Sequence, residues 1–181
     1  MSSAADQLAK FKSAIATPEV PMLGPQCRPG TLTEADLRRR LETFFDASHT
    51  PENLRALLRS AALLWHDHLD SSHNISQGIE TRDGSWLHGI MHRREPDYGN
   101  AKYWFRRVGQ HPAFPNLAGR AAELMRDHGD SLFDKSEWDP FAFIDECEAA
   151  EQGNDAEVTA VLRQIQAAEF DVLVEHLYQN A

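Results

Sequence analysis

Apolar residues recur at steps of three and four along most of this chain, and that spacing allows little besides α-helices. An α-helix repeats every 3.6 residues, so such steps gather apolar side chains on one face. The clearest run covers residues 51–69, where the shared face would carry Leu54, Leu57, Leu58, Ala61, Trp65 and His68. No convincing alternation of apolar and polar residues predicts a strand. The sequence therefore predicts an all-α protein of six or seven helices.

Residues with strong capping preferences mark where several of these helices begin. Thr31 and Glu34 have the spacing of a capping box, in which the hydroxyl and the carboxylate each satisfy a free backbone N–H group. Thr50 followed by Pro51 suits an N-cap and a first helical position. These signals predict helices that start near residues 31 and 51.

The length of 181 residues suits one compact domain. A short helix and a segment rich in proline and glycine occupy residues 1–30, and we expect the helical domain to cover residues 31–181. The polar stretch 71–84 reads as a loop because it contains two glycines and many turn-forming residues. Ser85 would then cap a helix over residues 86–95.

The cysteine content and the hydropathy point to a cytoplasmic protein. Cys27 and Cys147 are the only cysteines and form no CxxC spacing, which argues for reduced thiols. The first residues lack the apolar core of a secretion signal, and no apolar run reaches the roughly 20 residues that cross a bilayer. A formal net charge of -10 also argues against a nucleic-acid partner.

Charge is distributed unevenly along the chain. Residues 82–107 contain six basic and three acidic residues, whereas the chain from Asp127 onward contains fourteen acidic and two basic residues. One interpretation is that the basic stretch forms salt bridges with the acidic C-terminal helices.

Histidines are concentrated in one part of the sequence. Five of the nine lie between residues 66 and 92. His88 and His92 are four residues apart on a predicted helix, so their imidazoles project from one face, and Glu95 follows one turn later. Two histidines and a carboxylate can bind zinc or iron(II). We predict a divalent metal site for which the candidate ligands are His66, His73, His88 and His92.

The same cluster suggests a catalytic site between the helices predicted over 51–69 and 86–95. His88 and His92 would ligate a metal or act as acid and base, with Glu95 or Asp70 as the carboxylate. The alternative is a helix that buries Trp86, Leu87 and Ile90 and turns His88, His92 and Glu95 toward solvent. His68 falls on the apolar stripe and is expected in the core.

Basic and aromatic residues follow the histidines and form a candidate ligand-binding surface. Guanidinium groups bind carboxylates and phosphates through paired donors, so an anionic or polar small molecule is the expected ligand. The candidate residues are Arg93, Arg94, Tyr98, Asn100, Lys102, Trp104 and Arg107. Tyrosine, tryptophan and arginine also anchor protein interfaces. The alternative function is therefore a non-enzymatic binding or assembly module that uses residues 98–108, including self-association into a homo-oligomer.

The run Gly89 to Pro112, GIMHRREPDYGNAKYWFRRVGQHP, resembles a block shared by an uncharacterised family of bacterial and fungal proteins. Trp138-Asp139-Pro140-Phe141, further along the chain, resembles part of the same pattern. The resemblance covers the central and C-terminal two-thirds of the chain. It implies no activity and assigns no catalytic residue. The functional hypothesis from the residues is a small-molecule-acting protein with a pocket rich in histidine and arginine, as in a metal-dependent enzyme.

Overall fold

The computed structural model describes residues 3–126 and 137–180. Within those ranges the chain forms nine helices and no strand, which confirms the all-α class and exceeds the predicted helix count. The helices are α1 (Ala4–Ala14), α2 (Glu34–Ser48), α3 (Glu52–Trp65), α4 (Leu69–Ser76), α5 (Arg82–Arg94), α6 (Tyr98–Val108), α7 (Phe114–Leu124), α8 (Pro140–Gln152) and α9 (Ala156–Gln179). None of these helices is both long enough and apolar enough to cross a membrane.

The extra helix α4 lies where the sequence predicts a loop. The helix predicted over 51–69 ends at Trp65, because Asp67 adopts a left-handed backbone with φ of 66° and turns the chain. The next helix, α5, begins earlier than predicted. Thr81, not Ser85, is its N-cap, and the Thr81 hydroxyl accepts a hydrogen bond from Gly84 N at 3.0 Å.

Two other predicted caps are also placed differently. Thr33 caps α2 by accepting from Asp36 N at 3.2 Å, whereas the hydroxyl of Thr31 donates to the Arg28 carbonyl at 3.2 Å. At α3 the N-cap position itself is Pro51, which supplies no side-chain bond. The predicted helices are present, but each starts after the predicted cap.

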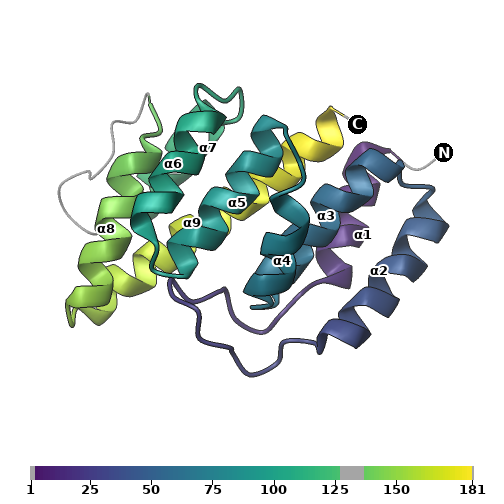
Figure 1. Cartoon of the computed structure of the whole chain (residues 1–181), viewed down its shortest axis with the longest axis horizontal. Helices are drawn as coiled ribbons and strands as arrows, with labels where there is room; N and C mark the ends of the chain where they lie inside the picture. The colour runs from purple at the N-terminus through teal and green to yellow at the C-terminus, as the bar shows by residue number, and fades with distance from the viewer. Residues whose placement is uncertain (1–2, 127–136, 181) are drawn as a thin grey trace.

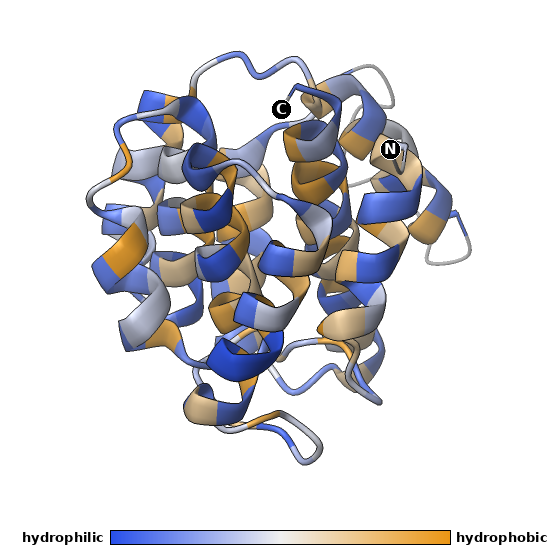
Figure 2. Cartoon of the chain, turned by 90° about the vertical axis from the view of Figure 1, so that its right-hand side faces the viewer, coloured by the Kyte–Doolittle hydropathy of each residue, from blue (hydrophilic) through white to orange (hydrophobic). Residues whose placement is uncertain are grey.

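Helix α5 is the centre of the fold (Figure 1). All residues from Gly84 to Arg94 are buried, since α4 and α6 pack beside this helix and α9 runs behind it. Orange and blue alternate along the outer helices in Figure 2, as expected for helices that bury one face. A helix buried on all sides can bring polar side chains together out of water.

The segment between α1 and α2 runs along one end of the bundle (Figure 1). Side chains of the bundle hold its backbone: Arg94 Nη2 donates to the Gly24 carbonyl at 3.3 Å, and Gln166 Nε2 donates to the Met22 carbonyl at 2.9 Å. Arg163 Nε donates to the Pro21 carbonyl at 3.2 Å. The proline-rich segment is thus tied to α5 and α9.

The close packing of α5 on α6 depends on Gly89. A Cβ atom at this position would lie 2.8 Å from the Phe105 ring, so Gly89→Ala should lower the free energy of unfolding by about 1–3 kcal/mol through overpacking. Gly119 in α7 is the matched control, because a Cβ there would meet nothing within 4 Å. Gly119→Ala should raise stability by up to about 1 kcal/mol. Urea denaturation of both variants tests the difference, and equal effects would contradict it.

Candidate functional site

Three histidines converge between α4 and α5. His73, His88 and His92 can each present a ring nitrogen so that the three atoms lie within 4.8 Å of one another. His88 Nε2 and His92 Nε2 are 2.9 Å apart and share a hydrogen bond. His73 stands across both rings at interplanar angles of 77° and 79°. We call these residues the three-histidine group.

The burial of this group decides between the two sequence-based alternatives. His88 and His92 are 2% and 6% exposed, so the helix with solvent-facing histidines is wrong. That alternative treated α5 as a surface helix, whereas α4 and α6 cover the face that carries these two residues. His73 is half-buried and comes from α4, so it forms the side of the group nearest to solvent.

The surroundings keep the two buried imidazoles neutral. Burial, helped by neighbouring His92 and His73, lowers the pKa of His88 to about 4. Burial also lowers the pKa of His92, although the charge of Glu95 opposes that shift. Neutral imidazole is the form that offers a lone pair to a metal ion. Neither residue would have to lose a positive charge to bind a metal ion at neutral pH.

Glu95 and Asn100 fix the ring of His92. Glu95 Oε2 lies 3.3 Å from His92 Nδ1, and its negative charge favours a proton on that nitrogen over one on Nε2. The Asn100 amide nitrogen is 3.0 Å from Nε2 and 3.4 Å from Nδ1. Such similar distances to both nitrogens place the amide against the face of the ring. A carboxylate bonded to the far nitrogen is the usual outer partner of a metal-bound histidine.

Trp104 fixes the ring of His88. The two rings stack with centroids 3.9 Å apart and an interplanar angle of 14°. The Arg107 guanidinium lies 5.1 Å from the Trp104 ring, and the stacked His88 leaves it only the opposite face. Trp104 and Arg107 therefore support His88, and of the predicted ligand-binding residues Asn100 and Trp104 reach the three-histidine group.

The remaining residues of the predicted basic and aromatic surface have other contacts. Lys102 forms an ion pair with Asp145 in α8. Tyr98 is half-buried against the hydrophobic core, and burial raises its pKa to about 12. Neither residue is brought to the three-histidine group.

Arg93 is predicted as a ligand-binding residue, but its side chain is buried in an ion pair. Arg93 Nη2 lies 2.5 Å from Glu169 Oε2 in α9 and 3.2 Å from the Gln166 side-chain oxygen. Trp86 Nε1 donates to the other Glu169 oxygen at 3.0 Å. This pair and the Lys102 pair match the expected salt bridges between the basic stretch and the C-terminal helices. The Arg93 guanidinium is therefore paired with the Glu169 carboxylate and not with the three-histidine group.

Arg94 is likewise occupied. Its Nη2 lies 2.7 Å from Asp67 Oδ1, and its Nη1 donates to the Leu64 carbonyl at 2.6 Å. Asp67 also accepts from Arg28 Nε at 2.9 Å. The two arginines therefore join α5 to the end of α3 and to the proline-rich segment. Sequence periodicity could not show this, because α5 is buried on every side.

His66 is a predicted metal ligand that the structure places elsewhere. Its Nε2 bonds the Ile15 carbonyl at 3.1 Å, and its Nδ1 accepts from Leu32 N at 3.0 Å. Both ring nitrogens thus bond the backbone at the two ends of the proline-rich segment. His68 Nε2 also bonds the Leu32 carbonyl, at 2.9 Å, and Asp70 is exposed on α4 outside the three-histidine group.

His66 should make stability depend on pH. Burial lowers its pKa from 6.5 to about 4, so the folded state binds fewer protons than the unfolded state between these values. Its contribution is complete above pH 6.5 and falls as pH drops toward 4, by about 2 kcal/mol between pH 7 and 5. The difference in unfolding free energy between wild type and His66→Gln should shrink by that amount, as measured by urea denaturation. A difference that is independent of pH would contradict the assignment.

A second cluster joins Asp83 at the start of α5, His111 before α7 and His176 near the end of α9. His111 Nδ1 accepts from Ala113 N at 3.2 Å, so its Nε2 carries the proton and donates to Asp83 Oδ1 at 3.1 Å. His176 Nδ1 faces the Asn180 amide nitrogen at 3.2 Å, and its Nε2 lies 3.7 Å from the same Asp83 oxygen. These partners favour a hydrogen-bonded link between helices over a metal site.

The two clusters thus differ in which ring nitrogens have a lone pair to offer. In the three-histidine group, His88 and His92 point Nε2 atoms at each other, and Nδ1 of His88 is buried without a hydrogen bond of normal geometry to the described residues. In the Asp83 cluster the backbone and Asn180 occupy the outer nitrogens. Comparison of the chain with protein-family models, with curated proteins and with solved structures finds no match.

Proposed function

We propose that the three-histidine group binds one divalent transition metal, zinc or iron(II), and that the protein is a metal-dependent enzyme acting on a small polar molecule. The observation that carries this proposal is the approach of the His88 and His92 Nε2 atoms to 2.9 Å beside His73. Two nitrogens on one tetrahedral zinc are about 3.3 Å apart, given bonds of about 2.0–2.1 Å. Small rotations of the rings would make room for the ion.

The buried Nδ1 of His88 supports this proposal independently. In the metal-free form His88 and His92 share a proton between their Nε2 atoms, and His88 Nδ1 has no normal hydrogen bond among the described residues. The backbone of Ser76 nevertheless favours a proton on this ring. Moving the proton to Nδ1 would satisfy that atom and free the Nε2 lone pair. Metal binding would thus remove an unsatisfied buried atom.

The number of ligands favours catalysis over a structural role. Structural zinc sites are closed by four protein ligands, whereas catalytic sites use three and leave a position for water or substrate. Three histidines form this group, and among the residues that the structure describes no cysteine or carboxylate joins it. A bound metal would supply a water with a pKa of about 7 or polarise a substrate oxygen.

The chain's own residues would have separate roles at such a centre. Glu95 would hold the proton on His92 Nδ1 and so keep Nε2 aimed at the metal. Trp104 would fix the plane of His88. Asn100, half-buried beside His92, would keep the His92 ring in position through its amide.

Cobalt(II) titration of the metal-free protein without a histidine tag tests the proposal. We expect one equivalent to bind with the intense visible absorption of a low-coordinate nitrogen site, and zinc to displace it. His73→Ala should abolish that absorption while the circular dichroism stays helical, because His73 is half-buried and at the edge of the group. His176→Ala is the control and should leave binding intact. No stoichiometric binding, or binding that survives His73→Ala and His92→Ala, would overturn the proposal.

A second candidate function is partner binding by the outer face of α6. Tyr103 is 49% exposed, which is unusual for a large aromatic residue, and Arg106 and Arg107 are exposed next to it. If this face mediates self-association, light scattering should show an oligomer that Tyr103→Ser dissociates. A protein that stays monomeric at all concentrations would exclude self-association through this face.

A further inference from the structure

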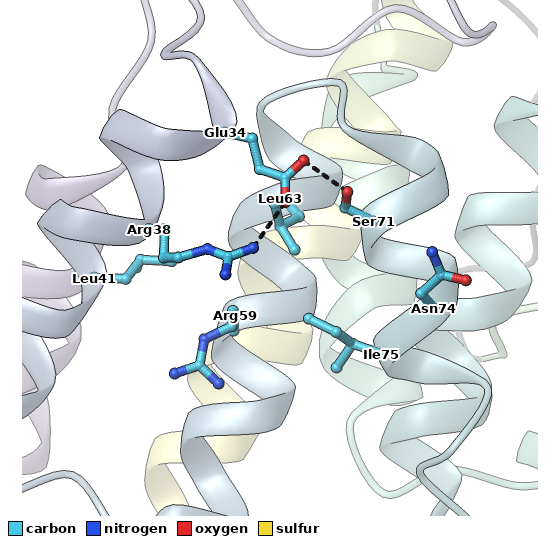
Figure 3. A pocket seen from close by; sticks show the side chains of 8 residues that line it. All are labelled: Glu34, Arg38, Leu41, Arg59, Leu63, Ser71, Asn74 and Ile75. Atoms are coloured by element: carbon cyan, nitrogen blue, oxygen red, sulfur yellow. Dashed lines mark hydrogen bonds and ion pairs between the residues drawn. The ribbon is translucent and has the colours of Figure 1, made fainter.

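A separate cleft of about 230 Å³ lies between α2, α3 and α4 (Figure 3). It exists because α2 packs on α3 at one side while α4 packs on α3 at the other. The lining residues are Glu34, Arg38, Leu41, Arg59, Leu63, Ser71, Asn74 and Ile75. None of them belongs to the three-histidine group.

The floor of this cleft is apolar, and two arginines lie at its mouth. Leu41, Leu63 and Ile75 supply the aliphatic surface. In Figure 3, Arg38 from α2 and Arg59 from α3 extend into the space between their helices. Glu34 is the acidic residue of the lining, and Glu42 beside the cleft pairs with Arg59, so each arginine faces one carboxylate.

Each guanidinium group contacts one carboxylate and still has donors to offer. Arg38 Nη2 donates to Glu34 Oε1 at 3.1 Å, and Arg59 Nη2 donates to Glu42 Oε1 at 2.7 Å. The second Glu34 oxygen accepts from the Ser71 hydroxyl at 2.8 Å, which closes one end of the cleft (Figure 3). A guanidinium has five N–H donors, so each single bond leaves others for a ligand.

We propose that this cleft binds a small amphipathic carboxylate, such as a medium-chain fatty acid. The carboxylate would lie between Arg38 and Arg59, where paired N–H donors suit its geometry. The alkyl chain would cover Leu41, Leu63 and Ile75 and remove their surface from water. The cleft would thus recognise both the carboxylate and the alkyl chain of the ligand.

Calorimetric titration with octanoate tests this inference, with 1-octanol as a neutral probe of the same chain length. We expect saturable 1:1 binding of octanoate, and binding of octanol at least tenfold weaker. Arg59→Gln and Arg38→Gln should each weaken octanoate binding about tenfold or more. Arg39→Gln is the matched control, because Arg39 is on the same helix, is 75% exposed, and pairs with Asp36 outside the cleft.

Three results would overturn the inference. They are the absence of saturable octanoate binding, equal binding of octanol, and octanoate binding that neither Arg38→Gln nor Arg59→Gln weakens. Urea denaturation of the two variants shows whether they fold, and both arginines are partly exposed. Cobalt binding by the same variants should be unchanged, so failure here is separate from failure of the metal proposal.

Discussion

Replacing Asp67 with alanine should lower the free energy of unfolding by about 3–5 kcal/mol, the usual cost of removing one partner from a buried ion pair. The Asp67 side chain is fully buried and lies between two guanidinium groups. It accepts from Arg94 Nη2 at 2.7 Å, and from Arg28 at both Nε and the backbone N. The substitution would leave both arginines without their carboxylate.

The part of the structure that loosens most should be the proline-rich segment, which Arg28 and Arg94 hold. Residues 15–33 should become accessible to protease in Asp67→Ala before the bundle unfolds, since this segment depends on the two arginines. Asp46→Ala is the control, because that side chain is 77% exposed and 3.6 Å from Arg55, and it should cost at most about 1 kcal/mol. A loss in Asp67→Ala that matches the control in urea denaturation would contradict a role for Asp67 at the centre of this network.

Replacing His92 with alanine should lower the affinity for cobalt or zinc by more than about 100-fold, since it removes a ligand, whereas loss of an outer partner typically costs 10–100-fold. Glu95→Gln removes such a partner and should fall within the smaller range. Glu95 is partly exposed, so this variant should keep its fold. Competition with a chelator of known affinity measures both constants.

Metal affinity should fall most in His92→Ala, less in Glu95→Gln and little in a control variant. His111→Ala is the control, because His111 belongs to the Asp83 cluster, whose outer ring nitrogens are occupied. It should change metal affinity little even if stability falls. If His111→Ala lowered the metal affinity as much as His92→Ala, the three-histidine group would not be the metal site.

The helical class could be predicted because most helices bury one face, and the apolar period records that face. Helix α4 was missed for a physical reason. Its residues Leu69–Ser76 have few strong helix formers, and tertiary bonds hold it, including Ser72 Oγ to the Ser60 carbonyl at 2.9 Å. Such bonds between residues of different helices leave no local pattern.

The candidate site was predicted in part. The density of histidines and the four-residue spacing of His88 and His92 pointed to α5, and His73 was among the candidate ligands. Arg93 and Arg94 are predicted ligand-binding residues whose guanidinium groups the structure places in buried ion pairs. Their partners Glu169 and Asp67 lie in other helices, so only the packing reveals these pairs. His66 bonds the backbone at Ile15 and Leu32 instead, and contacts so distant in the sequence leave no local pattern.

Diffraction at the zinc absorption edge from crystals grown with zinc would locate the metal ion itself. We expect one strong anomalous peak per chain, about 2.0–2.1 Å from a ring nitrogen of each of His73, His88 and His92. Glu95 should lie beside His92 Nδ1, on the side of the ring away from the metal. A peak at Asp83, His111 and His176 instead, or no peak near the three-histidine group, would show that the three-histidine group is not the metal site.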